Sequence, residues 1–466
     1  MGKRSKVVWS EHTYRVMVVV AAGSIGLGTL RCAGPDATWC PGAAPVYADG
    51  GVPALTQQGQ IFITGGAQGI GLSGTTAFVC AAGSINIIDV TDPMHLSVSK
   101  SFGSGGSGCT LNGSELVTYG SGDPFPVNIY SVADLANPQF LGSTSINYVF
   151  PHQLLIGGSY AFIPTLQFNY DAGLNVIAQH GDLTSVNLSP ASSPSLADVL
   201  FNTTGPPTGG NHNVWTGTFA NSTTLLIGST TSTGADVVDG TGTLLIVDVS
   251  NPMAMSVAGT LDIPGTLQLT GLSIQGNAAL AVGSSGSWNS GQSDLGLTGH
   301  IVLTALDVTD PRHPSIIAQQ SMSRASRGMG TPPVNIGEGL YAFPNLGPVG
   351  GQPEVIVVNA ADPHNMVTSE MPVPADVNAL ASGNGALYTS SAAGLYIYGV
   401  GSASGCVGDC NGNGEVTVSD VIMLVNIALG AAEASACPHG IPGSASVDIA
   451  LIVQAVNSAL TSCPAA

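Results

Sequence analysis

Residues 85–93, INIIDVTDP, contain the pattern that decides the fold. Isoleucine and valine are β-branched and favour a pleated, half-buried strand. The aspartate before Pro93 ends that strand, because proline lacks the N–H that a sheet ladder needs and holds the preceding residue extended. The stretch therefore predicts one strand that is followed at once by a polar turn.

The same strand-and-turn phrase returns along the chain. Clear copies lie at residues 244–252 (LLIVDVSNP), 301–311 (IVLTALDVTDP) and 355–363 (VIVVNAADP), and weaker ones at 127–138, 183–194 and 394–400. The last copy lacks the turn. The equivalent positions, 40 to 63 residues apart, are Asp89, Ser131, Ser185, Asp248, Asp307, Asn359 and Gly399. Such spacing is typical of four-stranded propeller blades with variable loops.

A second phrase precedes most copies: two apolar strands around a Gly or Asn turn, as in LSIQGNAALAV at residues 272–282. This phrase predicts a hairpin. A hairpin, a third strand, a turn and an outer strand make one blade, and seven blades close a ring without an exposed sheet edge. We therefore expect an all-β, seven-bladed β-propeller over residues 49–400. A β-sandwich or β-solenoid with the same turns is the alternative.

The phrases at residues 66–400 resemble the LVIVD repeat, a propeller family of bacteria and archaea found mostly in exported proteins. Copies one, four and five match it well, whereas copies three and seven are degenerate. The family has no single activity, so the resemblance implies a fold rather than a function.

The composition changes after a short Gly and Ser linker at residues 401–405. Residues 409–420, DCNGNGEVTVSD, follow the twelve-residue calcium-loop pattern of an EF-hand. An apolar stretch with helical spacing follows at residues 421–429. The predicted calcium ligands are the side chains of Asp409, Asn411, Asn413, Thr417 and Asp420 with the backbone carbonyl of Glu415.

The sequence VNIAL at residues 425–429 recurs as VNSAL at 456–460, 31 residues later. Loop, helix and duplication together resemble a type I dockerin over residues 406–466. The resemblance implies a small α-helical module that binds calcium and docks to a cohesin-like protein or anchors the chain. The second loop keeps only Asp448 among its expected ligands, so we expect one calcium ion. A loop that binds no metal is the alternative.

Charge and the N-terminus indicate where the protein acts. Nine Lys and Arg residues face 28 Asp and Glu residues, a net charge of −19, which disfavours nucleic acid as a partner. Basic residues before an apolar run of 15 residues at positions 16–30 predict a signal peptide within a leader of residues 1–48. The run is short for a membrane span, so we expect a secreted or cell-surface bacterial protein with no span in its mature form. An uncleaved anchor is the alternative.

The chain has eight cysteines, an even number that suits disulfides in an exported protein. Four lie at residue 406 or later, in the predicted module. Cys80 and Cys109 fall in the first two blades, where they either pair or remain buried thiols.

The candidate ligand-binding face is the mouth where the inner strands begin. Aligning the hairpins places Gln68, Ser107, His152, His212, Thr270, Pro332 and Asn378 at that level. Long loops emerge on the same side and carry Tyr170 and Trp288. Because loops on a rigid scaffold often carry binding residues, we expect a ligand there, with carbohydrate one candidate.

Three functions remain open. The first is a binding or scaffold protein without catalysis. The second is an extracellular enzyme, a hydrolase or lyase acting on polysaccharide, which would need a carboxylate pair at the mouth if it hydrolysed glycosides. The third is a metal-dependent oxidoreductase that uses His152 and His212, although a histidine at such a position often only caps a strand end.

Overall fold

The fold is described from a computed structural model of the chain. The structure describes residues 52–53, 55–120, 124–146, 150–151, 153–170, 176–200, 211–232, 241–286, 299–325, 331–337, 339–345, 352–400, 407–410, 416–437, 440–441 and 447–461. The predicted leader at residues 1–48 and the linker at 401–405 lie outside these ranges.

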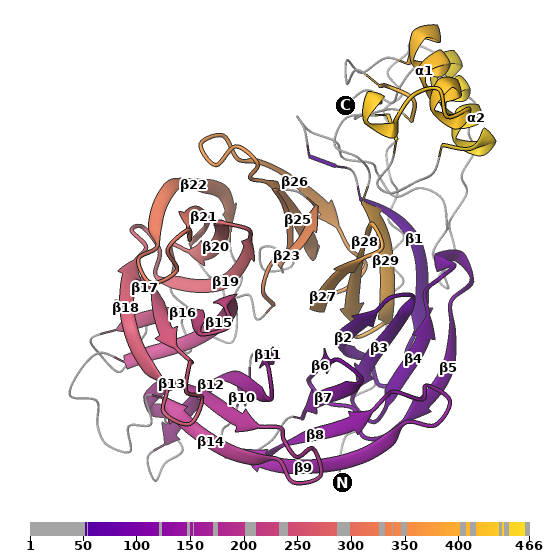
Figure 1. Cartoon of the computed structure of the whole chain (residues 1–466). Helices are drawn as coiled ribbons and strands as arrows, with labels where there is room; N and C mark the ends of the chain where they lie inside the picture. The colour runs from indigo at the N-terminus through magenta and orange to yellow at the C-terminus, as the bar shows by residue number, and fades with distance from the viewer. Residues whose placement is uncertain are drawn as a thin grey trace, which may run out of the picture. The chain divides into compact units, whose positions relative to one another are not determined.

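Seven antiparallel sheets surround a central axis, and each forms one blade (Figure 1). Blade 1 contains β2 (Ala67–Ser73), β3 (Thr76–Ala81), β4 (Ile85–Asp89) and β5 (Ser97–Phe102); blade 2 contains β6 (Gly108–Asn112), β7 (Glu115–Tyr119), β8 (Phe125–Ser131) and β9 (Gln139–Ile146); blade 3 contains β10 (Phe150–Pro151), β11 (Leu155–Gly157), β12 (Tyr160–Tyr170), β13 (Val176–Asn187) and β14 (Ser195–Leu200). Blade 4 contains β15 (Asn211–Asn221), β16 (Thr224–Ser232), β17 (Thr241–Asp248) and β18 (Ser256–Asp262); blade 5 contains β19 (Gln268–Gln275), β20 (Ala278–Ser284), β21 (His300–Asp307) and β22 (Ser315–Ala325); blade 6 contains β23 (Val334–Gly337), β24 (Leu340–Asn345), β25 (Glu354–Asn359) and β26 (Val367–Pro372); blade 7 contains β27 (Val377–Gly383), β28 (Ala386–Ser391), β29 (Gly394–Val400) and β1 (Leu55–Phe62). The predicted seven-bladed propeller is confirmed.

The first strand of the chain closes the ring. β1 pairs antiparallel with β29, so Leu55 faces Val400 and Phe62 faces Gly394. It therefore supplies the outer strand of blade 7, next to the last strand of the propeller. This closure explains why the final copy of the repeat lacks its turn: no outer strand follows it in sequence.

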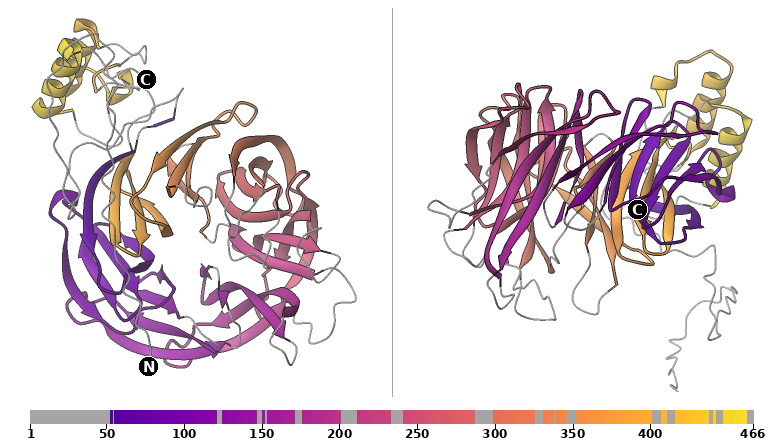
Figure 2. Two further views of the ribbon diagram at one scale, coloured as in Figure 1. Left: turned by 180° about the vertical axis from the view of Figure 1, so that it is seen from behind. Right: turned by 90° about the horizontal axis from the view of Figure 1, so that it is seen from below.

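The burial of each strand follows its place in the blade. β4, the third strand of blade 1, is buried along residues 85–88, whereas most of β5, the outer strand, is exposed. A third strand has neighbours on both sides in its own sheet, and further blades cover both of its faces. Viewed from the side, the strands run between the two faces of the ring (Figure 2).

Apolar side chains pack between neighbouring blades and form the core. Val79 and Ile88 of blade 1, for example, share one cluster with Tyr388 and Ile397 of blade 7. All four side chains are almost fully buried. The repeated apolar third strands therefore stabilise the ring by removing apolar surface from water at each blade junction.

Two side-chain caps explain the sequence of the repeated turn. The carboxylate of Asp89 accepts a hydrogen bond from the backbone N–H of Thr91 at 2.9 Å, and that of Asp92 accepts one from Met94 at 3.0 Å. The equivalent residues Asp248 and Asp307 make the same contact with the residue two positions later. These Asx turns replace ladder hydrogen bonds where each third strand ends.

The predicted equivalence of Ser185 in copy three is wrong. In blade 3 the side chain of Asn187 accepts from the backbone N–H of Ser189 at 3.0 Å, and Asn187 is the last residue of β13. Asn187 therefore corresponds to Asp89, two residues after the position inferred from the sequence. The Pro-rich continuation of this copy disguised the register.

The C-terminal segment contains two helices, α1 (Val418–Ala428) and α2 (Ile449–Thr461), and the short 3-10 helix η3 (Ala434–Ala436). Leu424 of α1 and Ala455 of α2 are fully buried in one small cluster, and a disulfide joins Cys410 to Cys437. No helix in the described part of the chain is long and apolar enough to cross a membrane.

Candidate functional site

A β-bulge recurs where the inner strands begin. The pairing register skips one residue between Ala67 and Gly69 in blade 1, and it skips one at the same level in three further blades. The bulged residues are Gln68, Trp215, Thr270 and Asn378. A bulge leaves one residue outside the ladder and changes the direction of its side chain. The bulges therefore mark one level of the ring, at its axial mouth.

Two predicted members of this level shift in register. His212 pairs with Thr231, three residues before the bulge at Trp215, so its predicted equivalence to Gln68 is wrong. The hairpin of blade 4 is longer than that of blade 1, and its strand begins beyond the mouth level. In blade 6, counting back from the pair of Val334 and Ala342 places Thr331 rather than Pro332 at this level.

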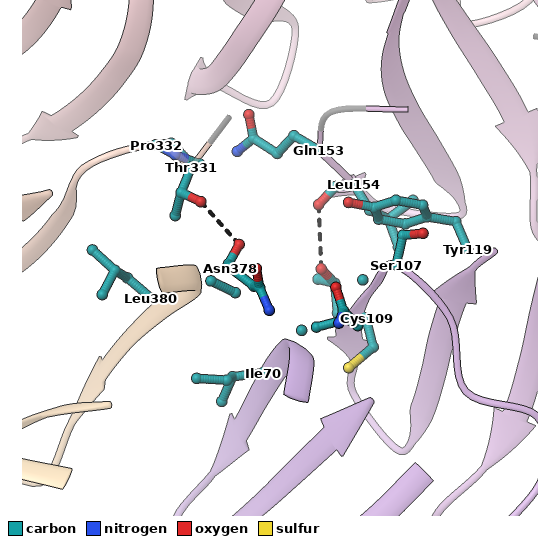
Figure 3. A pocket seen from close by; sticks show the side chains of 15 residues that line it. Ile70, Ser107, Cys109, Tyr119, Gln153, Leu154, Thr331, Pro332, Asn378 and Leu380 are labelled. Atoms are coloured by element: carbon teal, nitrogen blue, oxygen red, sulfur yellow. Dashed lines mark hydrogen bonds between the residues drawn. The ribbon is translucent and has the colours of Figure 1, made fainter. Parts of the chain in front are cut away.

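A cavity of about 160 Å³ lies at the mouth, and side chains from five blades line it (Figure 3). Gln68, Ser107, Pro332 and Asn378, all predicted at the mouth, contribute to its wall. Gln153 and Tyr119 line it as well. Ile70, Leu154 and Leu380 add apolar surface between these polar groups.

Hydrogen bonds to neighbouring blades hold several of the polar side chains in place. The side-chain amide of Asn378 donates to the carbonyl of Ala67 at 2.8 Å, across the junction of blades 7 and 1. The hydroxyl of Thr331 donates to the carbonyl of Asn378 at 2.9 Å. The side-chain oxygen of Gln153 accepts from the backbone N–H of Gly217 at 2.9 Å. The amide groups of Asn378 and Gln153 are therefore held in place by hydrogen bonds within the fold.

The described wall of the cavity is uncharged. Its polar groups are amides, hydroxyls and backbone atoms, and none of the described lining residues is an acid, a histidine, a lysine or an arginine. Tyr119 is 7% exposed, and burial raises the pKa of its phenol to about 12. Its hydroxyl faces the cavity and remains protonated at neutral pH (Figure 3). The wall can thus donate and accept hydrogen bonds but has no described group that would transfer a proton at neutral pH.

The other predicted face residues are only partly described. His152 and Trp288 lie outside the described residues. Tyr170 ends β12 and His212 lies in β15, but nothing is described of their side chains. Of the six predicted contacts, the structure brings Gln68 and Asn378 together in the cavity.

Gln153 and Tyr119 were not predicted as lining residues. Gln153 is the residue after His152, which lies outside the described residues, so the placement of His152 at the mouth stays a prediction. Tyr119 ends the second strand of blade 2, and the loop that follows it is shorter than the long loops that were considered at the mouth. Its signal in the sequence was an aromatic residue close to a loop at the mouth side of blade 2.

A disulfide joins Cys80 of β3 to Cys109 of β6 across blades 1 and 2, with 6.2 Å between the two Cα atoms. Pairing, rather than two buried thiols, is therefore the outcome. Cys109 also lines the cavity. The disulfide holds two walls of the mouth together.

The predicted calcium loop is described only at its ends. Asp409 is fully buried, whereas Asn411, Asn413 and Glu415 lie outside the described residues. Asp420 is 4% exposed, and its carboxylate accepts a hydrogen bond from the backbone N–H of Thr417 at 2.9 Å. Among the described residues, no group of three or more His, Cys, Asp or Glu side chains could hold a metal ion.

Asp409 and Asp420, one buried at each end of the loop, carry carboxylate oxygens, which are the donor type that calcium takes. Both side chains also have partners within the fold.

The two helices carry matching exposed apolar residues. Val418 and Ile422 are exposed on α1 and Leu429 at its C-cap, and Ile449, Val453 and Val456 are exposed on α2. Val418 and Ile422 each have a counterpart 31 residues later, which is the offset of the sequence repeat. Residues four apart lie on one face of a helix, so the duplicated module presents a similar apolar stripe twice.

The LVIVD repeat family model matches residues 64–103 and 235–263, within the propeller. No curated protein matches the chain. Solved structures that it resembles include Sqt1 from Saccharomyces cerevisiae, with 10% identity over 74% of this chain and 85% of that chain and a TM-score of 0.46. Others are BamB from Moraxella catarrhalis (13%, 74% and 99%, TM-score 0.44) and the WD40 β-propeller domain of Doa1 (10%, 74% and 96%, TM-score 0.47). The chain thus carries LVIVD repeats within a seven-bladed β-propeller.

Proposed function

We propose that this chain is an exported binding and scaffold protein. In this proposal, the propeller binds a ligand at its axial mouth, and the C-terminal module binds calcium and docks to a partner. The observation that carries the proposal is the cavity wall, where fixed amides and hydroxyls converge without a described charged group. Well-placed polar groups that fix the orientation of a ligand, together with apolar contact surface, are typical of ligand sites.

The wall gives no support to the alternative of a carbohydrate-active enzyme. Hydrolysis of a glycosidic bond usually needs two carboxylates that flank it. No Asp or Glu is found among the described residues that line the cavity. Binding without turnover is therefore the favoured role of this face.

Two disulfides within the described residues support export, because disulfides persist mainly in oxidising compartments. The basic and apolar leader supports it independently. Retention of the mature chain in the cytoplasm would contradict this part of the proposal.

A first experiment separates binding from catalysis. The purified full chain is incubated with a panel of polysaccharides, and both retention in affinity gels and release of reducing ends are measured. We expect retention without release. If the wild-type chain releases reducing ends, and this activity persists through repeated purification, the assignment as a non-catalytic binder is overturned.

A second experiment tests calcium. In the proposed site the side chains of Asp409, Asn411, Asn413, Thr417 and Asp420 and the carbonyl of Glu415 hold the ion, which would order the loop. Because the ion binds the folded state, it should raise the melting temperature of the module in the full chain. The variant Asp409→Ala should lose this gain, and Asp376→Ala, an exposed carboxylate of the propeller, should keep it. If EGTA leaves the melting of wild-type protein unchanged, the calcium site does not exist.

Docking is supported by the duplicated apolar stripes, since monomeric proteins seldom expose such residues together without a partner. The partner would be a cohesin-like protein or another component of the cell surface. A pull-down from the cell envelope and culture fluid, with and without calcium, tests this part. The double variant Ile422→Ser and Val453→Ser should lose the partner, whereas Val98→Ser on the propeller should retain it.

A further inference from the structure

We infer that the axial cavity binds an uncharged polyhydroxylic group, such as a single sugar residue of a neutral glycan. The inference rests on the proposed binding function and deepens it by naming the class of ligand. The inference starts from the residues at the mouth. Neither the family model nor the similar solved structures describe a site there.

Because the described wall is uncharged, it excludes ionic ligands. A charged group that enters the cavity loses water and meets no described counter-charge, which disfavours its binding. The chain as a whole carries a net charge of −19, which adds repulsion for anions. Tyr119 cannot serve as an anionic partner for a cation near neutral pH, because burial raises the pKa of its phenol to about 12. A neutral ligand meets neither penalty.

The hydrogen-bonding groups of the wall complement hydroxyls. Gln153 uses its side-chain oxygen to accept from Gly217, so its NH₂ group remains the donor end. Asn378 uses its NH₂ group to donate to Ala67, so its side-chain oxygen remains the acceptor end. The hydroxyl of Tyr119 adds a group that can donate or accept. Vicinal sugar hydroxyls, each a donor and an acceptor, match such an alternation of fixed donors and acceptors.

The apolar part of the wall complements the carbon skeleton of a sugar. Ile70, Leu154 and Leu380 lie around the same space as the amides (Figure 3). Pyranose rings present C–H faces between their hydroxyls, and these can pack against aliphatic side chains. The cavity of about 160 Å³ is smaller than the roughly 300–1,000 Å³ of sites that enclose drug-sized ligands. It therefore suits one ring of a longer glycan rather than several.

Titration calorimetry with the full chain tests the inference. The probes are matched pairs of oligosaccharides: manno-oligosaccharides against oligomannuronates, and galacto-oligosaccharides against oligogalacturonates. We expect at least one neutral member to bind at least tenfold more tightly than its uronate. Equal or tighter binding of the uronates would overturn the inference and leave the broader binding function standing.

Variants locate the site. Tyr119→Phe removes one hydroxyl and keeps the ring that packs over Gly108. Gln153→Glu replaces the donor end with a charged oxygen. Each variant should bind the neutral ligand at least tenfold more weakly, because a site built to hydrogen-bond a hydroxyl loses much of its affinity when one partner is missing. Tyr398→Phe, the same change at a buried hydroxyl that does not line the cavity, should have no effect.

Two further outcomes would overturn the inference. Neutral binding that is indifferent to both cavity variants would place the sugar elsewhere on the chain. If neither class of oligosaccharide binds at millimolar concentration, the cavity does not recognise sugars.

Discussion

Replacing Asp182 with asparagine is expected to stabilise the propeller at pH 8 and to change little at pH 4. Asp182 lies in β13 and has no exposed surface, and burial raises the pKa of its carboxyl group from 3.8 to about 7. The difference between the two pKa values corresponds to about 4 kcal/mol, since one pKa unit is about 1.36 kcal/mol. Asparagine keeps the shape of the side chain and removes the charge.

The sign follows from the protons bound in each state. Between about pH 4 and pH 7 the folded chain holds the proton that the unfolded chain has released, so the free energy of unfolding falls as the pH rises. Above about pH 7 the folded state contains a buried charge, and the full penalty is present. Asparagine carries no such penalty at any pH.

Differential scanning calorimetry of the full chain at pH 4.5, 6 and 8 measures this difference. The melting temperature of Asp182→Asn should exceed that of wild type by several degrees at pH 8 and approach it at pH 4.5. Asp376→Asn, the same change at an exposed carboxylate, should follow wild type at each pH. A constant difference across the series, or a loss of stability at pH 8, would refute the reasoning, because it would mean that the charge of Asp182 is compensated in the fold.

Three further substitutions probe the ring and the module. Gly59→Val should lower the melting temperature of the propeller by the equivalent of about 1–3 kcal/mol, because a Cβ atom at Gly59 would overlap the carbonyl oxygen of Pro93. Replacing Cys80 and Cys109 together with serine should cost about 3–4 kcal/mol by chain entropy, given their separation of 29 residues, and denaturant unfolding measures it. Leu424→Ala should cost about 2–5 kcal/mol in the module, since Leu424 is fully buried there, and calorimetry of the module transition measures it.

Each of these changes has a matched control. Gly83→Ala adds a Cβ atom with no other atom within 4 Å and should leave the melting of the propeller unchanged. Ile422→Ala removes an exposed side chain from the same helix as Leu424 and should leave the module folded. Removing the Cys410–Cys437 disulfide should affect only the module. If control and test variants behaved alike, the packing described at each position would be wrong.

The fold could be predicted because its signal is repeated. Buried third strands such as β4 appear in the sequence as apolar runs. The Asx caps that follow appear as aspartate or asparagine residues at fixed spacing before a proline. Copy three was misaligned by two residues, because Pro190 lies three residues after its cap Asn187, whereas Pro93 lies four residues after Asp89, and several Ser residues imitate the turn. Sequence alone placed the repeats, whereas only the pairing register identified Asn187 as the cap.

The candidate site was predicted in part for a similar reason. Gln68, Ser107 and Asn378 could be found by counting from hairpins of regular length. His212 could not be placed, because β15 and β16 extend past the mouth and the strand begins before the bulge. Tyr119 reaches the cavity from a second strand, so its position depends on how neighbouring blades pack, which no periodicity along the chain records.

The cavity also bears on how the ring is held shut. Its wall includes Thr331 of blade 6 and Asn378 of blade 7, and across the closure it includes Gln68 of blade 1. Asn378 already bonds to blade 1 through the carbonyl of Ala67, at the junction where β1 completes blade 7. A ligand held by these groups would contact both the first and the last blade, so it would bind only the closed ring and stabilise it by mass action. The proposed ligand would therefore add, at the axis, to the closure that the pairing of β1 with β29 provides at the outer edge of blade 7.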